Sequence, residues 1–292
     1  AITAYGEDGR VTRLTRAELK QQVLALAGWL QDHGVTAGDR VAAYTPNTVE
    51  AVITMLATAS LGAVFSSCSP DFGLQGVCDR FGQIEPKILI GCDGYHYAGK
   101  AIDRMDVLTS LAQKLPTIDT VLVIGYLSTQ PDCSRLPNAV LFDAAVANAT
   151  PITQFRRMPF NAPLYILYSS GTTGAPKCIV HGIGGTLIQH IKEHRLHTNV
   201  KAGDRLFYFT TCGWMMWNWL VSGIASKAHI LLYEGNPAYP GPDRLWRLAE
   251  REKISIFGTS AKYIDSIKNS GFLPADNVDL SSLQSILSTG SP

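Results

Sequence analysis

The sequence predicts an α/β fold, in which mostly parallel sheets are covered by helices on both faces. Short apolar runs typical of buried strands recur along all 292 residues. Helical patterns lie between most of these runs, and strands that alternate with helices indicate parallel sheets. In addition, a segment rich in hydroxyls and glycines stands directly behind one of the runs. Ligands of such folds bind at the carboxyl ends of the strands, where this segment falls.

Two N-cap patterns predict helices near the start of the chain. Thr15-x-x-Glu18 is a capping box and opens an amphipathic helix that runs to about His33. Asn47-x-x-Glu50 is a second N-cap pattern. It leads into a long uncharged stretch, residues 51–70, which contains several serines and threonines. We therefore expect a core helix followed by a strand here, and no membrane span.

The other elements follow from the same two periodicities. Apolar runs predict strands at residues 40–45, 64–67, 88–90, 121–124, 165–168, 230–233, 254–257 and 286–287. Helical patterns cover residues 101–115, 186–197, 244–253 and 261–270. The proline-rich stretch 131–163 is predicted to be a long irregular connection.

Composition restricts the partners and the compartment. Apolar residues make up 46% of the chain, and the formal net charge is +1. Because this charge, without a dense Lys/Arg run, gives no footprint for nucleic acid or an anionic membrane, we expect neither partner. Six cysteines without a C-x-x-C pair indicate reduced thiols of a cytoplasmic protein. The chain does not begin with Met, so we expect its first residue to lie inside a longer product.

Residues 168–177, which read Tyr-Ser-Ser-Gly-Thr-Thr-Gly-Ala-Pro-Lys, carry the strongest functional signal. Glycines let the backbone turn so that its N–H groups converge on an anion. Four hydroxyl side chains add donors, and a lysine adds a positive charge. This set predicts a polyphosphate-binding loop. Its candidate ligand-binding residues are Ser169, Ser170, Gly171, Thr172, Thr173, Gly174 and Lys177.

The segment does not follow the common nucleotide-binding motifs. Counted from Gly171, Pro176 stands where the P-loop has its second glycine, and no Gly-x-Gly-x-x-Gly occurs. The spacing instead resembles the phosphate loop of the adenylate-forming superfamily, which holds the β- and γ-phosphates of ATP during carboxylate attack on the α-phosphate. The resemblance implies that the loop contacts these phosphates, with Lys177 and Thr172 as catalytic candidates. Lys177 could instead be a surface lysine paired with a carboxylate.

Further segments narrow the resemblance to one branch of this superfamily. They read Thr-Thr-Cys-Gly-Trp-Met-Met-Trp-Asn-Trp (210–219), Tyr-Glu-Gly-Asn-Pro (233–237), Tyr-Pro (239–240), Phe-Gly-Thr-Ser-Ala-Lys-Tyr (257–263) and Leu-Ser-Thr-Gly-Ser-Pro (287–292). Together with the loop they resemble the acetoacetate–CoA ligase family over nearly the full length of the chain. An acetyl- or propionyl-type short-chain acyl-CoA synthetase is the alternative within the same superfamily.

The resemblance implies a two-step reaction on small molecules. ATP and acetoacetate would give acetoacetyl-adenylate and pyrophosphate, with Mg²⁺, and the thiol of CoA would then displace AMP. Gly290, Ser291 and Pro292 match the place where relatives hold adenine against the backbone. Position 291 is often Glu in acetyl-specific relatives, so Ser291 favours the acetoacetate branch.

The resemblance also implies an architecture. The chain would be part of the large N-terminal adenylation domain, with two interleaved lobes of mostly parallel sheet flanked by helices. Residues 46–200 would form one lobe, and residues 11–45 with 201–292 the other. The mobile C-terminal domain would be absent. Because the family's Mg²⁺-binding glutamate, ribose-binding aspartate and adenylation lysine would all lie beyond Pro292, we expect no adenylation by this chain alone. A non-catalytic nucleotide-binding fragment is therefore a further alternative.

Aromatic and sulfur-containing side chains supply a candidate acyl pocket. Trp214, Met215 and Met216 offer large apolar walls. If the segment is helical, Trp214 and Asn218 share a face at i,i+4. We hypothesise that Trp214 closes the pocket and that the Asn218 amide donates to the 3-keto oxygen. The alternative is a Trp/Met-rich core helix with Asn218 bonded to backbone.

A different chemistry is suggested by His-Ile-Lys-Glu-His at residues 190–194, which fits the H-x-x-E-H zinc-peptidase pattern. On a helix His190 and His194 would share a face, as a zinc site requires. A solvated polar helix face explains the same residues. Since five-residue patterns arise easily by chance and no other segment suggests peptidase chemistry, we expect no protein-bound metal among the site residues.

Overall fold

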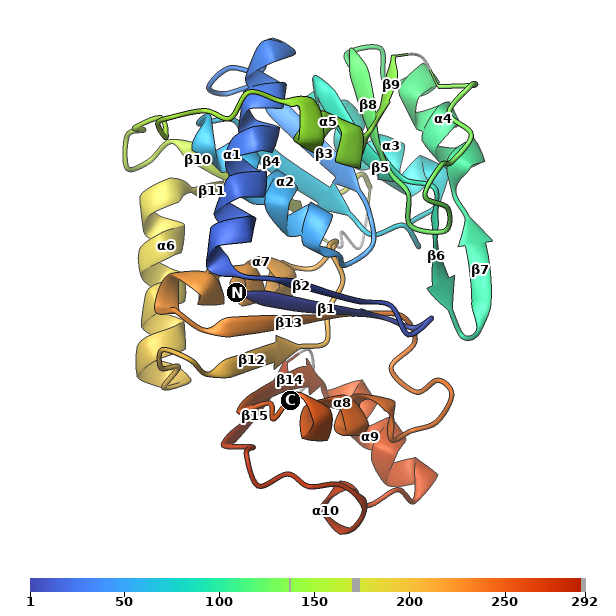
Figure 1. The fold of residues 1–292 in the computed structure, drawn as a ribbon, viewed down its shortest axis with the longest axis vertical. Helices are drawn as coiled ribbons and strands as arrows, with labels where there is room; N and C mark the ends of the chain where they lie inside the picture. The colour runs from blue at the N-terminus through green and yellow to red at the C-terminus, as the bar shows by residue number, and fades with distance from the viewer. Residues whose placement is uncertain (137, 170–173, 290–292) are drawn as a thin grey trace.

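The computed structural model describes residues 1–136, 138–169 and 174–289. Within these ranges two large sheets lie one above the other, with helices between them and on their outer faces (Figure 1). A separate hairpin of β6 (Gly94–Tyr97) and β7 (Lys100–Asp103) projects at one side. The predicted α/β class, with mostly parallel sheets flanked by helices, is confirmed.

The six-stranded sheet joins the start of the chain to its last third. Its strand order is β15-β14-β12-β13-β1-β2, and only the β1–β2 pair is antiparallel. The strands are β1 (Ile2–Gly6), β2 (Val11–Leu14), β12 (Arg205–Tyr208), β13 (His229–Glu234), β14 (Ile256–Ser260) and β15 (Ser285–Thr289). Because Ile2 pairs with Ile230, the two ends of the chain interleave.

The seven-stranded sheet takes the middle of the chain. Its order is β11-β10-β4-β3-β5-β8-β9, and only β10 and β11 pair antiparallel. The strands are β3 (Arg40–Tyr44), β4 (Val64–Cys68), β5 (Ile88–Cys92), β8 (Thr120–Ile124), β9 (Ala139–Leu141), β10 (Pro163–Tyr168) and β11 (Cys178–Gly182).

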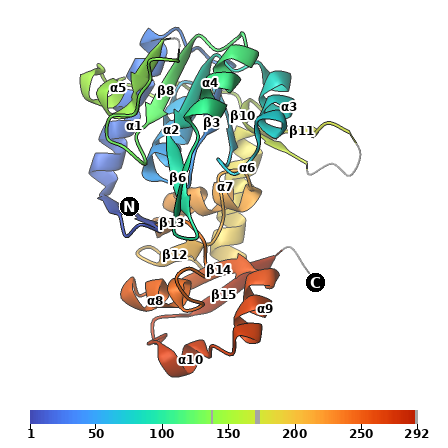
Figure 2. The ribbon, with the colours of Figure 1, turned by 90° about the vertical axis from the view of Figure 1, so that its right-hand side faces the viewer.

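Helices complete five layers (Figures 1 and 2). The α-helices are α1 (Arg16–Asp32), α2 (Val49–Ser60), α3 (Leu74–Ile84), α4 (Met105–Lys114), α5 (Phe142–Asn148), α6 (Ile183–Lys192), α7 (Met215–Ser222), α8 (Arg244–Arg251), α9 (Ala261–Ser270) and α10 (Pro274–Asn277). A π-helical turn, η1 (Glu193–His197), continues α6, and a 3₁₀ turn, η2 (Gly223–Ser226), follows α7.

The core consists of three apolar clusters that match these layers. The largest lies between the sheets and joins α1, α2 and α7 to both of them. A second packs α3 and α4 on the outer face of the seven-stranded sheet, and a third packs α8 and α9 on the outer face of the other sheet. Central strands are thus buried on both faces, which explains their uninterrupted apolar runs. No helix in the described ranges is long and apolar enough to cross a membrane.

The two N-cap predictions had different outcomes. Thr15 caps α1 with both hydrogen bonds of the capping box, as expected. The prediction that Asn47 caps the second helix was wrong, because α2 begins after Thr48 and its cap residue makes no side-chain hydrogen bond. The Asn47 side chain is instead held by residues of the other sheet, so tertiary contacts outweighed the local pattern.

Two expectations about chain organisation need correction. Residues 11–45 were expected to join 201–292, yet only β2 of that range lies in the six-stranded sheet. Arg40–Tyr44 pairs on both sides within the seven-stranded sheet. The stretch 131–163 is also more ordered than expected, since it contains β9 and α5. Phe142 and Ala145 of α5 pack into the core between the sheets, which supplies the stability that its local sequence does not signal.

Candidate functional site

The carboxyl end of β4 brings the predicted phosphate loop and the predicted acyl segment together. The Ser66 hydroxyl donates to the Ile166 carbonyl at 2.9 Å and lies 3.0 Å from the Tyr168 hydroxyl, at the base of the loop. The next residue, Ser67, points to the opposite face of the strand and donates to the Cys212 carbonyl at 2.6 Å. Two adjacent residues of one strand therefore fix both segments.

The loop leaves β10 and returns through β11, and its base is closed by two hydrogen bonds. The Ser169 amide donates to the Lys177 carbonyl at 3.0 Å, and the Lys177 amide donates to the Ser169 hydroxyl at 3.2 Å. Gly174 has φ of +92°, which favours glycine. Lys177 is exposed and forms no ion pair with the residues that the structure describes, so the surface-pair alternative gains no support. Ser170, Gly171, Thr172 and Thr173 lie outside the described residues.

The acyl segment divides at Trp214. This residue is the N-cap of α7, with extended backbone, and is 36% exposed, whereas Trp217 is fully buried. The ring of Trp214 meets Tyr208 edge-on at 6.0 Å. Met215 is exposed, and Met216 packs against the central core. Trp214 therefore lies partly exposed, directly before α7. The i,i+4 relation to Asn218 was expected on the condition that both residues are helical, and Trp214 is the cap residue of that helix.

Asn218 is fully buried, and neither its amide nitrogen nor its amide oxygen has a hydrogen-bond partner among the described residues. The alternative that backbone groups satisfy this side chain is therefore not what the structure contains. A buried amide without partners costs free energy, and such groups in native proteins call for an explanation such as a bound ligand or water.

A cavity of about 640 Å³ opens at the carboxyl ends of β12, β13 and β14. This volume lies within the range of small-molecule sites, and strand ends are where α/β folds bind ligands. Three of the segments quoted for the family resemblance converge on it, contributing Thr210, Thr211, Tyr233, Glu234, Gly235, Asn236, Pro237, Ser260, Lys262 and Tyr263. Ser69 and Asp71 enter from the end of β4, and Tyr95 and Tyr97 from the β6–β7 hairpin.

A buried carboxylate, Glu234, lies on the wall of this cavity. Its Oε2 accepts the Asn47 amide at 2.6 Å. Burial raises the pKa of Glu234 to about 7, and the negative charges of Asp71 and Glu7 act in the same direction. Glu234 therefore changes protonation near neutral pH, in contrast to an ordinary exposed carboxylate.

Asn47 connects Glu234 to the acyl segment. Its side-chain amide donates to the Thr210 and Tyr233 carbonyls at 3.2 and 3.3 Å, and its Oδ1 accepts the Trp217 indole N–H at 2.9 Å. These bonds join the turn after β3 to the ends of β12 and β13 across the two sheets. Asn47 thus holds the segment from Thr210 to Trp217 in position.

His190 and His194 are packing residues in this structure. His190 Nδ1 and His194 Nε2 lie 2.9 and 3.0 Å from the same Ser222 hydroxyl, and His194 Nε2 also lies 2.9 Å from the Trp219 carbonyl oxygen. Burial lowers the pKa of both histidines to about 4. In the described ranges no group of three or more His, Cys, Asp or Glu side chains could hold a metal ion.

Sequence reasoning missed Asn47, Glu234 and Asp71 as site residues. Glu234 lies inside a quoted segment, and its position at the end of an apolar run was the available signal. Asp71 follows a Ser-Pro turn directly after another such run, which is a comparable signal. The proposed adenine-binding residues Gly290, Ser291 and Pro292 lie outside the described residues.

Comparison with known proteins places the chain in a family. All of it, residues 1–292, matches the AMP-binding enzyme family. The chain therefore belongs to the AMP-binding enzymes, in agreement with its two interleaved sheets and the loop after β10.

Three of the similar proteins are acetoacetyl-CoA synthetases from different organisms. The chain is 51% identical to an acetoacetyl-coenzyme A synthetase of Rhizobium meliloti (strain 1021), covering 100% of this chain and 45% of the relative. It is 46% identical to an acetoacetyl-CoA synthetase of Gallus gallus, covering 97% and 43%. The solved acetoacetyl-CoA synthetase from Streptomyces lividans superposes with a TM-score of 0.94 at 44% identity, covering 100% and 44%. The chain thus spans less than half the length of these relatives.

Proposed function

We propose that this chain is the ATP- and acyl-binding portion of an acetoacetate–CoA ligase. The proposal rests on the contacts at the end of β4. Ser66 contacts the base of the proposed phosphate loop, and the adjacent Ser67 contacts the proposed acyl segment. A carboxylate bound near Trp214 would thus lie close to ATP bound at the loop. The identities to acetoacetyl-CoA synthetases favour acetoacetate over other short acids.

In the proposed reaction, the loop after β10 acts on the phosphates of ATP. The loop from Ser169 to Lys177 would bind the β- and γ-phosphates, and the exposed Lys177 ammonium would neutralise charge on the departing pyrophosphate. Donors and cations placed where charge develops are usually the largest catalytic contribution. The acetoacetate carboxylate oxygen would bond to the α-phosphorus as pyrophosphate leaves. The CoA thiolate would then bond to the carbonyl carbon as AMP leaves.

We propose that the cavity at the ends of β12–β14 receives the substrates beside this loop. The described residues offer no group of three or more metal ligands. We propose that Mg²⁺ would bind to the nucleotide phosphates and to a protein ligand in the downstream portion that the relatives have. The six cysteines are free thiols, which supports a reducing, cytoplasmic location.

The decisive test of substrate is a panel of carboxylic acids in a hydroxamate-trapping assay. It uses a protein that carries this chain together with the downstream portion that its relatives have. We expect acetoacetate to give the highest kcat/KM, above butyrate, propionate and acetate. A preference for acetate or propionate would establish the short-chain alternative instead.

A second test concerns this chain by itself, without the downstream portion. We expect it to bind ATP, detected as protection of the loop after β10 from proteolysis, and to show no acetoacetate-dependent pyrophosphate exchange. Lys177→Ala should abolish the protection. Exchange above background would show that the chain alone completes the adenylation site.

A further inference from the structure

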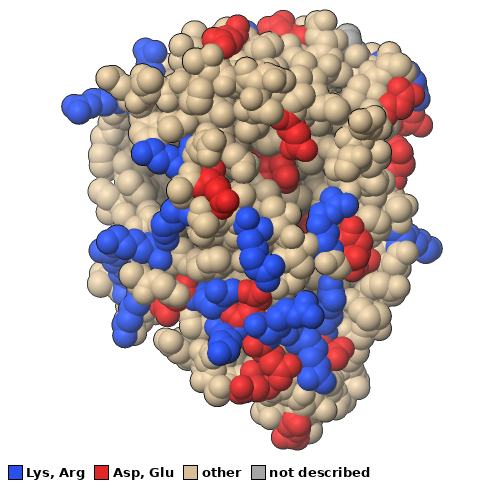
Figure 3. All heavy atoms as spheres, in the orientation of Figure 1, with Lys and Arg blue, Asp and Glu red and all other residues tan. Residues whose placement is uncertain are grey.

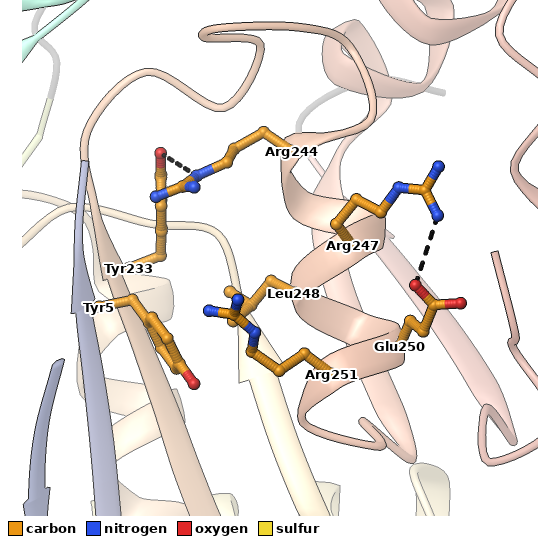
Figure 4. A pocket seen from close by; sticks show the side chains of 7 residues that line it. All are labelled: Tyr5, Tyr233, Arg244, Arg247, Leu248, Glu250 and Arg251. Atoms are coloured by element: carbon orange, nitrogen blue, oxygen red, sulfur yellow. Dashed lines mark hydrogen bonds and ion pairs between the residues drawn. The ribbon is translucent and has the colours of Figure 1, made fainter. Parts of the chain in front are cut away.

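A second pocket, of about 210 Å³, lies on the outer face of the six-stranded sheet, beneath α8 (Figure 4). Tyr5 of β1 and Tyr233 of β13 form its floor, and α8 forms its wall. The pocket is smaller than the sites of drug-sized ligands. Tyr233 also lines the large cavity, so the two sites share one residue of β13.

One face of α8 presents two guanidinium groups to this pocket. Arg244, Leu248 and Arg251 follow one another at i, i+4 and i+7, and Figure 4 shows both arginines reaching toward the tyrosines on either side of Leu248. Arg244 is held by the Tyr233 hydroxyl at 3.2 Å and the Gly6 carbonyl at 3.3 Å. Arg251 makes no hydrogen bond or ion pair with the other residues that line the pocket.

Arg247 differs from these two arginines. Figure 4 shows its side chain turned away from the tyrosines and toward Glu250, which it contacts at 3.4 Å. It also pairs with Asp243 at 3.3 Å and donates to the Asn277 carbonyl at 2.8 Å. Arg247 therefore has the same charge as Arg244 and Arg251, but its Nε and Nη1 groups already bind acceptors of the protein.

The carboxylates near the pocket do not neutralise Arg244 and Arg251. Glu250 is engaged by Arg247 and by the Asp279 amide at 2.7 Å. Glu252, which bonds to the Tyr5 hydroxyl, is paired with Arg13 at 3.0 Å and with Arg205. Figure 3 shows many Lys and Arg side chains, with Asp and Glu among them, over the lower half of this view, where α8 lies in Figure 1, and three arginines but one glutamate line the pocket. The pocket therefore has an excess of positive charge.

We propose that this pocket binds a small organic dianion, a phosphate monoester or a dicarboxylate, between Arg244 and Arg251. Guanidinium groups have five donors in a fixed fork that matches carboxylate and phosphate oxygens. Two nitrogens of Arg244 donate to the Tyr233 hydroxyl and the Gly6 carbonyl, which fixes the orientation of the guanidinium group. Its remaining N–H groups are available to a ligand. Leu248 and the Tyr5 ring provide the apolar surface for a short carbon skeleton.

The test is isothermal titration of the expressed protein with glycerol phosphate and with succinate, and with acetate as a monoanion control. We expect saturable binding of at least one dianion and none of acetate. The tighter of the two ligands identifies whether the site prefers a phosphate ester or a dicarboxylate. Absence of saturable binding by both dianions would overturn the proposal.

Variants locate the binding. Arg251→Gln removes one charge-assisted contact to the ligand and no hydrogen bond or ion pair to the described part of the protein, so we expect about a tenfold rise in Kd with an unchanged melting temperature. Arg247→Gln, on the same helix, should leave Kd within about twofold. Equal weakening by both variants would show a general charge effect and overturn the assignment.

A phosphate ester could also occupy the phosphate loop, and Lys177→Ala separates the two sites. Binding beneath α8 predicts that Lys177→Ala retains the affinity and that Arg251→Gln loses it. The opposite pattern would place the ligand in the loop and overturn the proposal, while leaving the proposed function intact.

Discussion

Two glutamates, Glu252 and Glu234, are equally buried, with 7% and 9% of their surfaces exposed, and yet their surroundings differ. Glu252 follows α8 and is met by the Tyr5 hydroxyl and by two arginines, Arg13 and Arg205. Glu234 ends β13 and accepts one backbone amide, with no cation paired to it in the described ranges, and burial raises its pKa to about 7. Burial alone thus does not tell a structural carboxylate from one in a binding site.

The difference extends to the polar groups around each glutamate. The Glu252 carboxylate itself is satisfied within the protein by one hydroxyl and two guanidinium groups, as expected for a group that stabilises the fold. Among the residues that the structure describes, the region between β13 and α7 holds both an ionisable carboxyl without a counter-ion and Asn218 without a hydrogen-bond partner. Polar groups left unsatisfied in a folded protein are typical of sites that receive a ligand. Three predictions test this distinction, in order of decreasing effect.

The first of two large expected effects, each about 3 kcal/mol, is that of Glu252→Ala. It leaves the buried Tyr5 hydroxyl and two arginines without their acceptor, and breaking a buried pair costs about 3–5 kcal/mol. Because Arg13 and Arg205 are 60% and 30% exposed, we expect a loss near the lower limit, about 3 kcal/mol, in urea unfolding. The matched control is Glu250→Ala on the same helix, whose carboxylate is 35% exposed and should cost less than about 1 kcal/mol. Equal losses would remove the basis for the comparison.

Glu234→Gln should change the pH dependence of stability. The folded-state pKa of Glu234, about 7, lies above its ordinary value of 4.5, so the folded protein binds the extra proton. The stability that protonated Glu234 contributes to the wild-type protein is therefore complete below pH 4.5 and is lost as the pH rises through 7. The difference should reach about 3 kcal/mol by pH 8, in favour of the variant.

The measurement for Glu234→Gln is urea unfolding of both proteins between pH 4.5 and 8. Comparing the two proteins at each pH cancels the contribution of His190 and His194, whose pKa values are lowered and whose effect has the opposite sign. A difference that does not vary with pH would show that Glu234 is ionised throughout and belongs with Glu252.

The smallest expected effect is that of Asn218→Leu, which replaces a buried amide without partners by an apolar side chain of similar size. We expect a gain of about 1 kcal/mol in unfolding free energy, because the desolvation cost of the amide disappears. The matched control, Asn47→Leu, should instead destabilise, since it leaves two carbonyls and the Trp217 indole unpaired. In the longer protein, Asn218→Leu should also lose the preference for acetoacetate over butyrate. Retained preference would exclude a contact with the keto oxygen.

Elements with strong local signals were predicted well. The capping box at Thr15 and the helix over residues 261–270 agree with the structure because caps and helical periodicity are written in consecutive residues. Several strands buried on both faces were found as apolar runs, but the buried strands β1 and β12 were missed. The edge strands β2 and β11 were also missed; each includes exposed positions, and β2 alternates apolar with polar residues instead of forming an apolar run.

Local signals also account for the part of the candidate site that the sequence indicated. Glycines, hydroxyls and a lysine in ten consecutive residues indicate phosphate binding locally, since a loop concentrates its ligand-binding groups along the chain. Asn47 and Glu234 act together although 187 positions separate them, and no local pattern records that contact. The Asn47 pattern was even misleading, because an N-cap and a buried bridging amide have the same sequence.

The sequence by itself determined the class of fold, the position of the loop proposed to bind phosphate and the family to which the chain belongs. These properties rest on periodicity and on consecutive residues. Only the tertiary structure decided that the loop and the acyl segment meet at Ser66 and Ser67, that Glu234 is buried without a cation, and that two arginines converge beneath α8. These properties arise where distant segments pack together, and the free energy of a buried charge or amide depends on the neighbours that packing supplies.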